Sequence, residues 1–217
     1  MRKHLPHRPF GLNPTHVTIR LAGSIPQAVL QAMRSDREQR IEEVFRQTKE
    51  LTEDDRDTFL EQQLEQVDDL YEQSLETALH EQSNGPYYLQ EPAIAQEVIK
   101  SCQWLETNRD LKLYALCVMG NHVHVLLGSK SGESIPSGPI MKSWKNFTAL
   151  QCNRMLDRTG QSFWSVGYFD RDIRPNKFFT VLWYILNNPV KAGLVQRWSD
   201  WPHTYLSEEL VGFFLEG

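Results

Sequence analysis

The stretch M-G-N-H-V-H-V-L-L at residues 119–127 constrains the fold of this chain more than any other feature. It has the pattern of a buried strand that carries two histidines separated by one valine. Because successive side chains of a strand point to opposite faces, His122 and His124 share one face and Val123 takes the other. Two imidazoles on one face can bind the same divalent metal ion, and the simpler alternative is a pair of hydrogen-bonded strand histidines. The dyad alone leaves both interpretations open.

Length and composition favour a single domain, 1–217, with room for one insertion. Of the 217 residues, 40% are hydrophobic, which is enough for a core. We expect no membrane association, because no apolar run reaches the roughly 18 residues of a transmembrane helix and no apolar segment follows the basic N-terminus. Three widely spaced cysteines, Cys102, Cys117 and Cys152, fit a reducing cytoplasm better than a disulfide framework.

Charge is unevenly distributed along the chain. Residues 34–82 hold 16 acidic and 6 basic side chains, a net charge of −10, whereas the remainder holds 12 acidic and 17 basic side chains, a net charge of +5. The overall pI of about 5.8 would argue against a nucleic-acid partner. That argument applies to the acidic segment alone, because the rest of the chain is mildly basic.

The acidic segment has a helical pattern. Its apolar residues recur every three or four positions, which predicts helices at about 27–50 and 53–82. Thr52 followed by Asp55 resembles a capping box, and S-N-G-P at 83–86 is a stop signal. We therefore predict a helical hairpin inserted at about 27–83. Its charge is interpreted as a solvated outer face, with binding to a partner or repulsion of DNA as the alternative.

The remaining segments alternate between strand and helix. Strands are expected at 15–21, 113–119, 120–127 and 163–169, and helices at 92–105, at 140–156 and from Pro175 to Asn188. This order predicts an α+β fold, a ferredoxin-like β-α-β-β-α-β sandwich whose antiparallel sheet has helices on one face, followed by a further helix. His16 in the first strand is interpreted as part of a polar strand face rather than of a site.

The last predicted helix carries a second polar group. Tyr184 precedes Asn188 by four residues, so both are expected on one helix face. Asn188 could supply a neutral oxygen ligand, and Lys177 lies about two turns before Tyr184. For a tyrosine alone on a helix, the ordinary interpretation is an amphipathic residue with its hydroxyl at the surface.

Three segments together resemble the HUH single-tyrosine transposases. Residues 119–127 resemble the histidine-hydrophobic-histidine metal motif of that family. Residues 163–174, F-W-S-V-G-Y-F-D-R-D-I-R, resemble its W-x-x-G-Y-x-D-R-x-I-R segment, and residues 184–195, Y-I-L-N-N-P-V-K-A-G-L-V, resemble its Y-I-x-N-N-P-V-K-A-G-L-V segment. The motifs occur in the family's order over about 15–205, and the chain is most similar to the REP-associated tyrosine transposases.

The resemblance implies a site and an activity. Tyr184 would be the nucleophile, His122 and His124 would bind Mg²⁺ or Mn²⁺, and Asn188 would complete the site. The enzyme would cleave and rejoin single-stranded or hairpin DNA through a 5′-phosphotyrosine. The oligomeric state, monomer or homodimer, stays open. Six basic residues are expected to hold DNA phosphates: Lys142, Lys145, Arg171, Arg174, Lys177 and Lys191. Three tryptophans could stack on unpaired bases, although core packing is the ordinary role for each: Trp144, Trp164 and Trp183.

The chain departs from the family pattern in three respects. Gly120 stands where the family usually has proline, the acidic insert is uncommon, and Tyr168 is a competing nucleophile. Tyr168 ranks second because it is expected on a strand with no ligand four residues later. The main alternative is a catalytically silent DNA-binding or regulatory protein derived from such a transposase. A metal hydrolase barrel is disfavoured, because the chain is short and only His203 follows His124.

Overall fold

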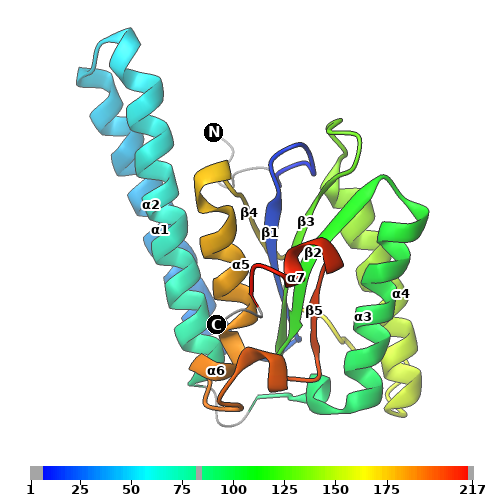
Figure 1. Cartoon of the computed structure of the whole chain (residues 1–217). Coiled ribbons are helices and arrows are strands. Elements are labelled where there is room, and N and C mark those ends of the chain that lie inside the picture. Colours follow the sequence, from blue (N-terminus) through cyan, green and yellow to red (C-terminus); the bar gives the residue numbers. More distant parts are fainter. Residues whose placement is uncertain (1–6, 82–84, 215–217) are drawn as a thin grey trace. The chain divides into compact units, whose positions relative to one another are not determined.

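A computed structural model describes residues 7–81 and 85–214. The chain divides into two compact units (Figure 1). We call Ile25–Gly85 the hairpin unit, and His7–Ser24 together with Pro86–Gly217 the body. Among the described residues, no helix has the length and apolarity needed to cross a membrane.

The hairpin unit consists of helices α1, Gln27–Gln47, and α2, Glu53–His80, joined by the short helix η1, Thr48–Glu50. These bounds confirm the predicted helices at 27–50 and 53–82. The hydroxyl of Thr52 caps α2, accepting from the Asp55 backbone N–H at 3.4 Å and donating to the Asp55 carboxylate at 2.7 Å. An ion pair of 2.6 Å between Arg37 and Asp68 links the two helices. Of the predicted stop signal, residues 83 and 84 lie outside the described residues.

The body is built on a five-stranded antiparallel sheet with the order β4-β1-β3-β2-β5. The strands are β1, Thr15–Arg20, β2, Leu111–Val118, β3, His122–Ser129, β4, Phe169–Asp172, and β5, Thr204–Leu206. Helices α3, Pro92–Asn108, and α4, Ser137–Met155, connect them. Strands β1 to β4 and these two helices follow the predicted β-α-β-β-α-β order, and β5 is an edge strand that the sequence did not reveal.

Two predicted elements differ from the observed ones. The strand expected at 163–169 begins only at Phe169, because Gly167 takes a positive φ of 72° and turns the chain before β4. The helix expected from Pro175 is divided into η3, Pro175–Lys177, α5, Phe178–Leu186, and α6, Asn188–Lys191. Pro189 explains the second break, since proline is tolerated in the first turn of a helix but not in its interior.

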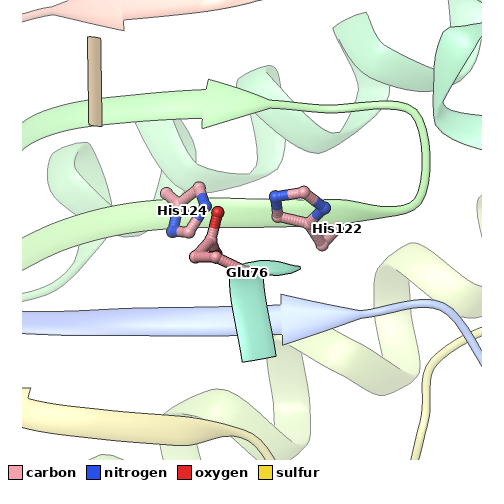
Figure 2. Close-up of side chains that lie close together, drawn as sticks. All are labelled: Glu76, His122 and His124. Carbon is pink, nitrogen blue, oxygen red and sulfur yellow. The ribbon is translucent and has the colours of Figure 1, made fainter. Parts of the chain in front are cut away.

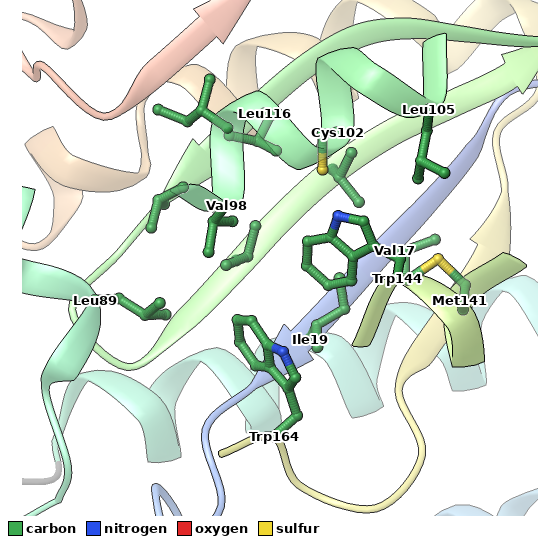
Figure 3. Packing of buried hydrophobic residues seen from close by; sticks show 14 of the residues in the cluster. Val17, Ile19, Leu89, Val98, Cys102, Leu105, Leu116, Met141, Trp144 and Trp164 are labelled. Atoms are coloured by element: carbon green, nitrogen blue, oxygen red, sulfur yellow. The ribbon is translucent and has the colours of Figure 1, made fainter. Parts of the chain in front are cut away.

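Alternate residues of the strands give the sheet two different faces. On the apolar face, side chains such as Val17 and Ile19 pack against α3 and α4 (Figure 3). Trp144 and Trp164 are buried in this core with their ring centroids 5.5 Å apart, so two of the three tryptophans have the ordinary packing role. The opposite face carries His122 and His124 and is called the histidine face.

Helix α5 packs on the histidine face of the body. Its Leu182 and Ile185 join a second buried cluster with Leu126 of β3 and Cys117 of β2. The two helices of the sandwich lie on one face, as predicted, and the additional C-terminal helix lies on the other face, which the sequence had not indicated. The second cluster fixes the position of α5, and thereby of Tyr184, over the central strands.

Candidate active site

Strand β3 places both histidines of the dyad on the histidine face, as the alternation predicted (Figure 2). Their ring centroids are 4.8 Å apart and the rings are nearly perpendicular, at 87°. The β1–β3 register sets Arg20 opposite His122 and Thr18 opposite His124. The two imidazoles are therefore neighbours on β3, the central strand of the sheet.

The His122 ring is oriented by its neighbour in the sequence. Its Nδ1 lies 2.6 Å from the side-chain oxygen of Asn121. Because an amide oxygen only accepts, Nδ1 carries the proton and donates, and Nε2 of this tautomer carries the lone pair. A hydrogen bond to the second nitrogen is the usual way in which a protein orients a metal-binding histidine.

The His124 ring has polar neighbours at both nitrogens. Its Nδ1 lies 3.2 Å from the Thr18 hydroxyl and 3.1 Å from His16 Nε2, and its Nε2 lies 3.1 Å from the Asn188 side-chain nitrogen. His16 lies on a polar strand face, as interpreted from the sequence, and it contacts His124 there. Pairing of β1 with β3 brings these side chains together, and the parity shared by His16 and Thr18 was the only sign of it in the sequence.

Tyr184 of α5 lies beside the histidines. Its ring centroid is 5.6 Å from that of His124 and 5.9 Å from that of His16, in edge-on arrangements. Asn188 also reaches the site, on the same side as Tyr184, because both residues contact His124. They belong to consecutive helices and not to one, since α5 ends at Leu186 and Asn188 starts α6.

The competing tyrosine, Tyr168, lies on the other side of the sheet. Phe169 pairs with Thr18 and faces the histidines, so the residue before it packs against the apolar core. The Tyr168 hydroxyl lies 3.3 Å from that of Ser137, and its ring stacks on His7 at 3.9 Å. Burial raises the pKa of Tyr168. The sheet thus separates this phenol from the dyad.

Two of the six predicted DNA-binding residues lie at this site. The Lys191 ammonium is 4.5 Å from the centroid of the Tyr184 ring, a cation–π contact. Arg171 of β4 pairs with His16 of β1, which sets it on the histidine face. Positive charge therefore accompanies the tyrosine and the histidines.

The other four basic residues are distributed more widely. Arg174 and Lys177 precede α5, at its N-terminal end. Lys142 and Lys145 belong to α4, on the opposite layer. The Lys145 ammonium donates to the backbone oxygens of Ser165 and Gly167, each at 2.7 Å, so it fixes the turn before β4. Burial, and to a smaller extent the charge of Arg20, lowers the pKa of Lys145 to about 8.

The turn between β2 and β3 accounts for the glycine that replaces the family's proline. A Cβ atom at Gly120 would come within 2.9 Å of the side chains of Tyr87 and Gln90. The Gly120 carbonyl also accepts from the Leu89 N–H at 3.2 Å. In this chain a larger residue at position 120 would require the side chains of Tyr87 and Gln90 to shift.

Comparisons with known proteins agree with the motifs. The model of a family described as "Transposase IS200 like" matches residues 87–188, which include the histidine dyad, Tyr184 and Asn188. A solved structure described as a REP-associated tyrosine transposase bound to a REP hairpin is similar to this chain, with a TM-score of 0.51 and 15% sequence identity. The alignment covers 99% of this chain and 88% of that one, and it shows a shared fold. No curated protein sequence matches.

These findings confirm the resemblance inferred from the three motifs. Residues 87–188 are similar to the IS200-like transposases, and the α+β fold is shared with a REP-associated tyrosine transposase. The match starts after β1 and the hairpin unit, so His16 and the two acidic helices lie outside it.

Proposed function

We propose that this protein is a transposase that cleaves and rejoins single-stranded or hairpin DNA with Tyr184 as its nucleophile. The observation that carries the proposal is the position of the Tyr184 ring, 5.6 Å from His124 and beneath the Lys191 ammonium. A phenol, two histidines and a cation in one place suit attack on a phosphodiester. The family match and the shared fold support the same reaction class.

The chemical step requires no external energy source. The phenolic oxygen of Tyr184 forms a bond to phosphorus as it loses its proton, and the bond from phosphorus to the 3′ oxygen breaks. The 3′ oxygen takes up a proton, which leaves a 5′-phosphotyrosine and a free 3′-OH. A 3′-OH of another strand can reverse the step and join the DNA. Lys191 favours the reaction because its charge stabilises negative charge developing on the phenolic oxygen.

The residues of the site suit a divalent cation. His122 has the tautomer in which Nε2 can be a ligand, and His124 stands next to it. Asn188 presents its nitrogen to His124, so it can serve as a ligand after its amide group turns to present the oxygen. When bound, Mg²⁺ or Mn²⁺ would neutralise charge on a non-bridging phosphate oxygen, and imidazole ligands favour Mn²⁺.

DNA is proposed as the partner because the body is basic where the site lies. Lys191 and Arg171 accompany the tyrosine and the histidines, and the rest of the chain outside residues 34–82 has a net charge of +5. The similar solved structure holds a REP hairpin. A cytoplasmic location is proposed because DNA is there, and because none of the three cysteines, all of them among the described residues, forms a disulfide.

The test is formation of a covalent protein–DNA adduct. Wild-type protein incubated with hairpin DNA and Mn²⁺ should give a slower band on a denaturing gel, and the adduct should map to a peptide that contains Tyr184. Tyr184→Phe removes only the phenolic oxygen and should abolish the adduct while DNA binding persists. Tyr168→Phe is the matched control and should still form the adduct.

Three results would contradict parts of this proposal. An adduct that persists in Tyr184→Phe and disappears in Tyr168→Phe would identify the other tyrosine. Undiminished cleavage in EDTA would show that the reaction does not need a metal. Absence of an adduct with every hairpin substrate, despite tight DNA binding, would favour the catalytically silent DNA-binding protein.

A further inference from the structure

An aromatic cluster lies on the outer side of α5, beside the residue proposed as nucleophile. Phe179 and Trp183, one helical turn apart, are each 49% exposed. Two phenylalanines that follow the short helix α7, Glu208–Val211, complete the cluster. Phe213 lies 5.2 Å from Phe179, and the Phe214 ring lies 6.2 Å from that of Trp183 with only 6° between their planes. Phe179, Trp183, Phe213 and Phe214 are called the aromatic cluster below.

The exposure of Trp183 distinguishes it from the two other tryptophans considered as stacking surfaces. Trp144 and Trp164 are buried at 3% and 7% exposure, whereas Trp183 is half exposed and Phe213 is 68% exposed. The core-packing role expected for Trp183 was therefore wrong. Large rings that gather at a surface keep apolar area in contact with water, which is the usual sign of an interaction site.

The arrangement of α5 connects the cluster to Tyr184. Thr180 is three residues before Trp183 and four before Tyr184, so it lies between them on the outer side of the helix. Its small side chain is exposed. A strand of DNA with its phosphate at Tyr184 could thus cross α5 over Thr180 and reach the flat rings without obstruction by a large residue.

The charges around the cluster indicate the kind of partner. Lys177 is exposed and lies on the side of α5 that carries Tyr184, about two turns before it. Lys191 stands over the Tyr184 ring. Of the two acids of α7, Glu209 is already paired with Lys112 at 3.1 Å. Cations beside Tyr184, together with uncharged rings on the same helix, fit a polyanion with flat apolar bases.

We propose that the aromatic cluster binds unpaired nucleobases of single-stranded DNA next to the cleaved phosphodiester, while Lys177 and Lys191 hold the adjoining phosphates. The inference rests on the proposed function in one respect, that single-stranded DNA is the substrate. It adds a base-binding surface formed by α5 and the C-terminal segment. Stacking tolerates any base, so the surface would contribute affinity and direction rather than sequence specificity.

The experiment compares two probes in the Tyr184→Phe background, in which cleavage cannot disturb the measurement. Fluorescence anisotropy gives the Kd of a labelled oligothymidine and of an oligonucleotide of the same length made of abasic sites. Trp183→Ala should weaken oligothymidine binding by roughly 5- to 100-fold, the usual cost of losing one stacked base, and leave the abasic probe unchanged. Trp183→Phe should restore part of the loss. Phe213→Ala, at the most exposed ring, should act in the same direction.

Trp104→Ala is the matched control, because Trp104 is 54% exposed on α3, in the other layer of the body. It should change neither Kd. Oligothymidine affinity within twofold of the parent in both Trp183→Ala and Phe213→Ala would overturn the proposal. An equal loss of affinity for both probes would also overturn it. So would sedimentation that shows a dimer which Trp183→Ala dissociates without a change in DNA affinity. If protein that retains Tyr184 forms no adduct, Tyr184 is not the nucleophile. The difference in affinity between the two probes would still test the base-binding surface.

Discussion

The two faces of one sheet make a useful comparison, because the same strands supply both. On β3, Val123, Val125 and Leu127 join the apolar core, whereas His122 and His124 face α5. Strand β1 divides in the same way, with Val17 and Ile19 on one side and His16 and Thr18 on the other. Residues next to each other in the sequence therefore have different physical roles.

The difference shows how the body combines stability with chemistry. The apolar face is sealed by α3, α4 and two buried tryptophans, so it gains free energy from burial. Its polar groups are few, and the Trp164 indole N–H donates to the Thr148 hydroxyl at 2.8 Å. The histidine face buries imidazoles, which need hydrogen-bond partners. The apolar face holds the strands in register, and that register sets the distances among the polar groups on the opposite face.

The largest expected effect concerns the histidine face. His124→Ala should lower the rate of hairpin cleavage by about a thousandfold or more, because it removes the residue that adjoins Tyr184, His16 and Asn188. Far-UV circular dichroism should stay close to that of the wild type. Cleavage within tenfold of the wild type would show that the chemistry does not depend on this face.

The next largest effect concerns the apolar face, where a substitution should reduce stability and not activity. Leu127 is 1% exposed on the apolar face of the same strand, so Leu127→Ala should lower the free energy of unfolding by about 2–5 kcal/mol. The part of the protein that remains folded should keep its cleavage activity. Urea denaturation measures the first quantity and an adduct assay at low temperature measures the second. A folded but inactive variant would contradict the separation of stability and cleavage between the two faces.

A third prediction asks whether the body maintains both faces by itself. Deletion of residues 27–83, closed with a short linker, should leave a folded protein, because the body has its own core and sheet. Its affinity for single-stranded DNA should hold or rise, because the deleted part includes all of residues 34–82, which have a net charge of −10. Calorimetry and anisotropy test the two statements. An insoluble or molten product would mean that the hairpin unit is needed to complete the body.

The smallest expected effect concerns a histidine outside the site. His203 lies at the end of the sheet, where its carbonyl accepts from Val118 N–H at 2.9 Å, and burial lowers its pKa below the ordinary value of 6.5. As the pH falls below 6.5, the unfolded chain takes up a proton that the folded protein resists. The contribution to stability is therefore present above pH 6.5 and is lost at lower pH. In His203→Gln, the denaturation midpoint should depend less on pH between 7 and 5, and an identical dependence would contradict this.

Much of the fold could be predicted from the sequence because it depends on local periodicity. The two acidic helices, the capping box at Thr52 and the shared face of His122 and His124 follow from spacings of 3.6 and 2 residues. Tyr184 could be singled out only through its motif, because nothing local distinguishes it from another amphipathic tyrosine. The strand expected at 163–169 was misplaced because the turn conformation of Gly167 overrides the extended pattern around it.

Only the tertiary structure determined which residues meet. Pairing of β1 with β3 brings His16 and Thr18 to His124, and strand alternation without a partner strand cannot give that register. Packing of α5 on the second cluster brings Tyr184 to the histidines, and the new helix at Asn188 aims its amide at His124. The same packing left Trp183 exposed while Trp144 and Trp164 were buried. Contacts between residues far apart in the chain depend on how elements pack, whereas their local structure depends on neighbours that the sequence already displays.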